Sequence, residues 1–134
     1  MRDNTEFKQV LEKRTLHFSA SVINTLAKLR FHEALRNVIY QLSRSATSIG
    51  ANYREANHCE SRQDFIHKIS IVLKELNETL YWLDLLNLFD FISLEEKRLF
   101  EPLHKEAKEI YALFISIICT AKRNTKPQTQ DKTS

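Results

Sequence analysis

The feature that most constrains the fold of this 134-residue chain is its shortage of turn-forming residues, with one glycine and two prolines. Sandwiches and barrels built from short β-strands need many tight turns, which depend on such residues, so an all-β fold is excluded. The residue types that favour helices, among them Leu, Glu, Lys, Arg and Ala, are plentiful. We therefore predict a single all-α domain.

Apolar residues recur at spacings of three and four in four segments, which is the pattern of helices with one buried face. The predicted helices cover residues 6–29, 33–57, 61–88 and 93–123. Short connectors between long helices predict an antiparallel up-down-up-down four-helix bundle over residues 1–123. Pro102 should either kink the fourth helix or split it in two. The polar segment 124–134 has no apolar residue and is predicted to be a disordered tail.

Charge and cysteine content restrict the class of protein further. Lys and Arg total 20 against 17 Asp and Glu, and this net charge of +3 is too small to identify a nucleic-acid binder. Cys59 and Cys119 lack the spacing of a metal or redox motif, so we expect reduced thiols in a cytoplasmic protein. No signal peptide is visible at the N-terminus. The longest apolar run, residues 110–121, is too short to span a membrane, and no membrane partner is expected.

Two E-x-x-H sequences, Glu55 to His58 and Glu101 to His104, raise the possibility of a metal-dependent bundle enzyme. In an up-down bundle the first motif ends the second helix and the second begins the fourth, so they should lie at opposite ends. No nucleophile motif or phosphate-binding loop is present either. The sequence predicts no catalytic residue, no bound metal and no cofactor.

Basic residues collect on one side of the second predicted helix. The candidate nucleic-acid-binding residues on this side are Arg36, Tyr40, Arg44 and Arg54. Arginine can bind phosphate with two hydrogen bonds, and tyrosine can stack on a base. The alternative is that these residues form an ordinary solvated helix face.

The third predicted helix carries more apolar residues than one core face needs. The candidate oligomer interface lies on its outward side and consists of Ile71, Trp82, Leu85 and Phe89. Burying each large apolar side chain is worth about 1.5–3 kcal/mol, which favours self-association. The alternative is that another segment of the same chain covers this group.

Two motifs carry a family resemblance, namely SIGAN at residues 48–52 and Asp64–Phe65 at the start of the third helix. Together with the residues around them, they resemble the bacterial 23S rRNA intervening-sequence proteins over about residues 7–124. The resemblance implies a ring-shaped homopentamer of four-helix bundles without catalytic residues. Some members are encoded within insertions in large-subunit rRNA genes. Related proteins are accessory factors of diversity-generating retroelements, which work with a reverse transcriptase and its RNA.

The leading functional hypothesis is a non-enzymatic, homo-oligomeric bundle that binds RNA, DNA or a nucleic-acid enzyme such as a reverse transcriptase. The basic surface of the second helix would make this contact. An oligomeric scaffold that binds only protein is the main alternative. A metal-dependent bundle enzyme is the third.

Overall fold

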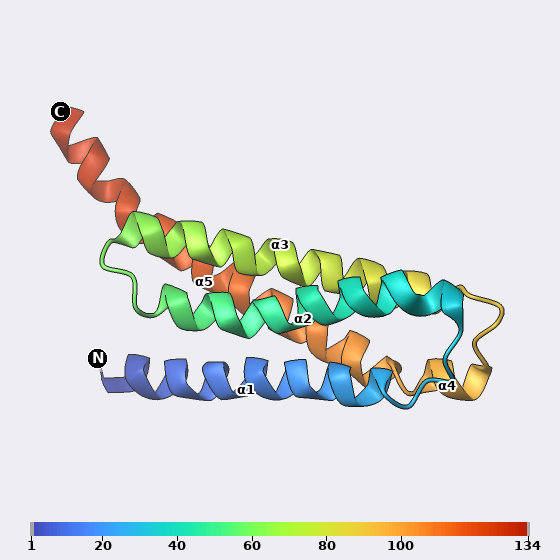
Figure 1. Cartoon of the computed structure of the whole chain (residues 1–134). Coiled ribbons are helices and arrows are strands. Elements are labelled where there is room, and N and C mark those ends of the chain that lie inside the picture. The colour runs from blue at the N-terminus through green and yellow to red at the C-terminus, as the bar shows by residue number, and fades with distance from the viewer. Residues whose placement is uncertain (1, 134) are drawn as a thin grey trace.

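The computed structural model describes the backbone of residues 2–133 and the side chains of residues 5–125. These residues contain no strand, and the predicted all-α class is confirmed. Their helices are α1 (Arg2–Leu26), the 3-10 turn η1 (Glu33–Leu35), α2 (Arg36–Ala56), α3 (Arg62–Leu86), α4 (Leu94–Arg98) and α5 (Glu101–Thr133). The four long helices lie side by side (Figure 1). The predicted tail, residues 124–134, falls almost wholly outside the described side chains and stays a prediction.

Contacts between the helices fix their directions. Ser19 of α1 donates a hydrogen bond to the carbonyl of Ala46. Glu12 lies two turns before Ser19, and it accepts a hydrogen bond from Asn57, which lies three turns after Ala46. These two helices therefore run in opposite directions. Figure 1 shows the same alternation continuing through α3 and α5. The chain thus follows the predicted up-down-up-down course.

Side-chain caps define where the helices begin. The Ser61 hydroxyl accepts a hydrogen bond from the Asp64 amide at the start of α3. At α4, Ser93 and Glu96 cap each other's backbone amides, which is the reciprocal capping box that their spacing predicts. Both caps confirm helix starts that the sequence indicates.

Pro102 splits the last predicted helix instead of kinking it. Helix α4 ends at Arg98, and α5 begins at Glu101, one residue before the proline. A proline in the first turn of a helix is tolerated because an amide there has no intrahelical acceptor. Between the two helices, Phe100 turns inward and is buried. This turn forms one corner of the bundle.

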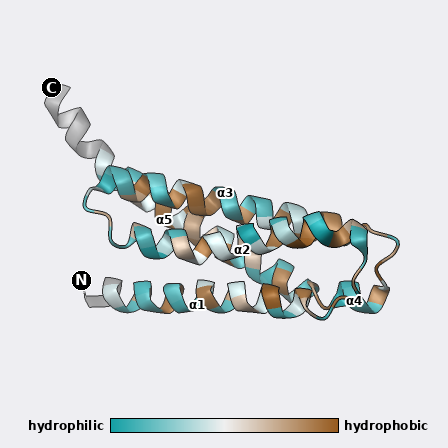
Figure 2. Cartoon of the chain, in the orientation of Figure 1, coloured by the Kyte–Doolittle hydropathy of each residue, from teal (hydrophilic) through white to brown (hydrophobic). Residues whose placement is uncertain are grey.

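The core runs along the shared axis of the four long helices, and Figure 2 shows apolar and polar residues alternating along each of them. Near its middle, the rings of Tyr53 and Phe114 meet edge to face with their centroids 5.0 Å apart. Burial also raises the pKa of Tyr53. The apolar spacing of the first helix also predicts Phe7 on the buried face, but this side chain is 46% exposed.

Helices α1 and α2 approach each other closely at Gly50. A Cβ atom added to this glycine would lie 3.0 Å from the Oγ1 atom of Thr15, which is fully buried. The Thr15 hydroxyl bonds to the carbonyl oxygens of Leu11 and Glu12 within α1. Close packing therefore explains why a glycine occupies the middle of this helix.

Neither cysteine forms a disulfide, and Cys119 is exposed while Cys59 is half-buried. Across the part of the chain that the structure describes, every helix is too short or too polar to cross a membrane.

Candidate nucleic-acid interface

The start of α2 carries an arginine and two exposed aromatic side chains within a short stretch of chain. The Arg36 guanidinium lies 5.5 Å from the ring centroid of Phe31, which is 59% exposed. Tyr40 follows one turn later and is 63% exposed. Arg36 also donates two hydrogen bonds to Glu33, of 2.9 and 3.0 Å, and these hold the pKa of that carboxyl below its ordinary value. Exposed ion pairs of this kind are worth little, so a phosphate can replace the carboxylate.

Arg44 occupies a different environment from Arg36. It donates a hydrogen bond to Glu78 of α3, and its guanidinium lies 3.6 Å from the Glu75 carboxylate. Glu75 is only 7% exposed, and its Oε1 atom has no hydrogen-bond donor among the described residues. Because a buried carboxylate depends on Arg44 for its neutralisation, this arginine contributes to the α2–α3 packing.

Arg54 lies at the opposite flank of α2. Its Nε atom is 3.7 Å from the Glu12 carboxylate of α1, which also accepts a 2.8 Å hydrogen bond from Asn57. The three α2 arginines are thus paired with carboxylates from three different parts of the chain. A count of charges within α2 leaves out the carboxylates that other segments bring to these arginines. This side of α2 is therefore less positive than its sequence alone indicates.

The candidate interface residues Ile71, Trp82, Leu85 and Phe89 are half-buried. The last three pack against the core of the same bundle. The buried face of α3 includes two polar residues, Glu75 and Thr79, in addition to the apolar residues that the spacing predicts. It is therefore broader than the apolar pattern alone indicates. The four residues therefore lie along the flank of α3 and do not face straight outward.

Two other apolar side chains of α3 are more exposed than the predicted interface residues. Tyr81 packs edge to face on Trp82, with the ring centroids 5.0 Å apart, and its own ring faces solvent. Leu88, just beyond the end of the helix, is 76% exposed. Neither residue is among the four candidate interface residues, because helical spacing alone does not show how far the neighbouring helices cover each flank of α3.

The two E-x-x-H sequences lie at opposite ends of the bundle, at the end of α2 and the start of α5 (Figure 1). Glu55 pairs with Lys68, and His104 pairs with Asp84. Within residues 5–125, no group of three His, Cys, Asp or Glu side chains is placed to hold a metal ion.

These helices and their contacts place the chain in the class of all-α helical-bundle proteins. The sequence profile of the 23S rRNA-intervening sequence protein family matches residues 8–116, and the chain belongs to this family. It is also similar to a crystal structure, solved at 1.70 Å resolution, of a protein of unknown function from the S23 ribosomal protein family of Bacteroides thetaiotaomicron. The two chains are 41% identical, with a TM-score of 0.67, and the match covers 83% of this chain and 96% of the other. No curated protein matches this sequence.

Proposed function

We propose that this chain is a non-enzymatic, homo-oligomeric bundle protein that binds unpaired RNA or DNA through the exposed side of α2. One observation carries the nucleic-acid part of the proposal, namely Arg36 packed on the exposed Phe31 ring, with exposed Tyr40 one turn later. Arginine supplies the phosphate contact, and the aromatic rings supply platforms on which unpaired bases stack. The family name, which refers to rRNA, supports the same class of ligand.

The binding residues differ in their expected contributions. Arg36 pairs with the exposed Glu33, and Arg54 lies 3.7 Å from the half-buried Glu12 carboxylate, so a phosphate can compete with both contacts. Arg44, held by one half-buried and one buried carboxylate, takes part mainly through the positive field that it contributes. Tyr40 and Phe31 add stacking that does not depend on salt.

The test measures the affinity of the full chain for a single-stranded RNA at several salt concentrations. The double variant Arg36→Gln/Arg54→Gln should lower the magnitude of the slope of log affinity against log salt by about 1.4, since each lost phosphate contact removes about 0.7. Tyr40→Ala should weaken binding about tenfold without changing that slope, because stacking releases no counterions.

A matched control separates a specific surface from general charge attraction. Lys13→Gln/Lys74→Gln removes the same charge from exposed positions of α1 and α3 and should leave the affinity nearly unchanged. Equal losses in the two double variants would contradict a binding surface on α2. An RNA affinity too weak to measure in the wild type would favour the protein-only scaffold.

Self-association is the second part of the proposal. The outer side of α3 leaves Tyr81 and Leu88 in contact with solvent, next to the half-buried Trp82 and Phe89. A second copy packed there would remove this apolar surface from water. The resemblance to the intervening-sequence proteins implies five subunits in the assembly.

Light scattering on the wild type and on Leu88→Glu tests the assembly. We expect the wild type to be oligomeric at micromolar concentration and Leu88→Glu to dissociate, because a buried unpaired charge is costly at an interface. This variant is more informative than Trp82→Glu, which would also disturb packing inside one bundle. Lys13→Glu, a charge change at an exposed position of α1, is the control and should stay oligomeric. A monomeric wild type would overturn this part of the proposal.

A further inference from the structure

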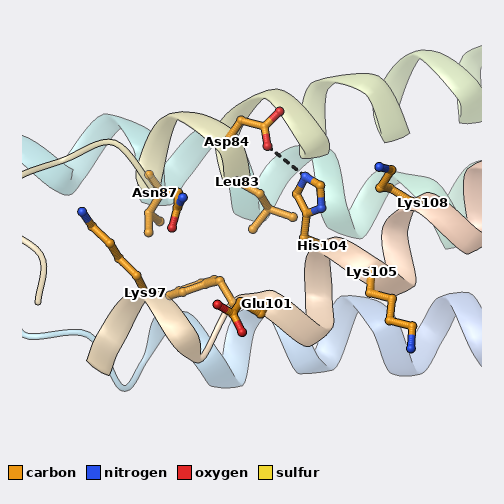
Figure 3. A pocket seen from close by; sticks show the side chains of 10 residues that line it. Leu83, Asp84, Asn87, Lys97, Glu101, His104, Lys105 and Lys108 are labelled. Carbon is orange, nitrogen blue, oxygen red and sulfur yellow. Dashed lines mark hydrogen bonds and ion pairs between the residues drawn. The ribbon is translucent and has the colours of Figure 1, made fainter. Parts of the chain in front are cut away.

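A cleft of about 490 Å³ lies where the C-terminal end of α3 meets the corner between α4 and α5 (Figure 3). Its buried floor consists of Leu83, Leu86 and Phe100. Its lining residues come from α3, α4, α5 and the break between α4 and α5. Cavities of this size accommodate small organic ligands.

The rim of the cleft is basic. Lys97 comes from α4, and Lys105 and Lys108 come from neighbouring turns of α5. Within residues 5–125, none of the three forms an ion pair. Arginines elsewhere in the bundle, such as Arg14 with Glu106 and Glu109, are neutralised by carboxylates. The cleft therefore concentrates positive charge that the fold leaves uncompensated.

The acidic residues of the cleft do not cancel this charge. Asp84 lies 2.8 Å from the Nε2 atom of His104, so that its carboxylate is already engaged. Glu101 is the other carboxylate in the lining, and it makes no ion pair with Lys105 one turn later. The lining thus carries three lysines and two carboxylates, one of which is occupied by histidine.

Figure 3 shows how these groups are arranged. Lys97 and Lys108 stand on either side of the His104–Asp84 pair, whereas the ammonium group of Lys105 points away from that pair. Two cations on opposite sides of a cleft match an extended anion that carries more than one phosphate. Lysine also binds phosphate as a flexible point charge, so both side chains can close on such a ligand.

We propose that this cleft binds a phosphate-bearing ligand between Lys97 and Lys108, with the apolar floor receiving the less polar part of the same molecule. The ligand is a small phosphorylated metabolite or the sugar-phosphate backbone of a nucleic acid, which share this chemistry. The site lies on α3, α4 and α5, and it is separate from the α2 surface.

Calorimetry with inorganic pyrophosphate on the full chain tests the site. Wild type should bind saturably at low salt, and Lys97→Gln/Lys108→Gln should weaken binding about tenfold or more, since both contacts are charge-assisted. Lys105→Gln is the matched control, with the same chemical change on the same cleft, and should bind like wild type. All these side chains lie at the surface, so unfolding midpoints should confirm that the variants are folded.

Competition with a single-stranded RNA lacking a terminal phosphate distinguishes the two sources of phosphate. If RNA displaces pyrophosphate and loses affinity in Lys97→Gln/Lys108→Gln, the backbone of a nucleic acid occupies the cleft. If RNA leaves pyrophosphate in place, the ligand is a small phosphorylated molecule. The proposal fails if wild type does not bind pyrophosphate, or if the double variant and the Lys105 control bind it equally. Failure of the cleft proposal in either way would leave the α2 proposal standing, because the α2 variants are tested by their RNA affinity.

Discussion

Replacing Gly50 by valine should lower the free energy of unfolding by about 1–3 kcal/mol, because the helix contact at this position has no room for a side chain. The first added carbon alone would lie 3.0 Å from Thr15 Oγ1 and 3.3 Å from Thr15 Cβ. Thr15 cannot move aside easily, since its hydroxyl bonds to two carbonyl oxygens of α1. The two further methyl groups of valine would push α1 and α2 apart.

Urea unfolding at a fixed protein concentration measures this loss, and Ala51→Val is its matched control. Ala51 is the next residue of the same helix and is exposed, so valine there should cost only a few tenths of a kcal/mol of helix propensity. Valine has a better intrinsic helix propensity than glycine, so a loss at Gly50 must come from packing. Equal losses at the two positions would contradict the close contact.

The course of the chain could be predicted from its sequence because local patterns determine it. The spacing of apolar residues identified the four long helices, and the Ser61 and Ser93 caps fixed the starts of α3 and of the short α4. The spacing misassigned core residues at the edges of the buried helix faces, where either of two consecutive apolar residues can occupy one core position. The three-and-four spacing favours Ile39 and Ile117 for the core, but Val38 and Ile118 are the buried residues, and Ile39 and Ile117 are only partly buried.

The surfaces were harder to predict because they depend on residues far apart in the sequence. The acidic partners of Arg44 come from α3, and that of Arg54 comes from α1, so a helical wheel of α2 cannot reveal them. The lysine cleft depends on the corner between α4 and α5. Sequence patterns did not decide whether Pro102 splits or kinks the last helix. The split observed in the structure places Lys97 and Lys108 on separate helices at one cleft.

The largest loss of stability is expected from Arg44→Met, which should lower the free energy of unfolding by about 3 kcal/mol. The substitution keeps an apolar side chain against α3 but leaves the buried Glu75 carboxylate without its cation. Glu75 already has one oxygen without a hydrogen-bond donor, so no other described group can take over. Arg36→Met is the matched control, because its partner Glu33 is exposed and the loss of a solvent-screened surface pair should change stability little.

A double variant assigns the loss to the buried charge. Arg44→Met/Glu75→Leu removes both charges, and replacing a buried pair by apolar groups of similar size is often close to neutral. We therefore expect urea unfolding to show the double variant recovering most of the stability that Arg44→Met loses. If the double variant is no more stable than Arg44→Met, the arginine acts through Glu78 or through its own packing.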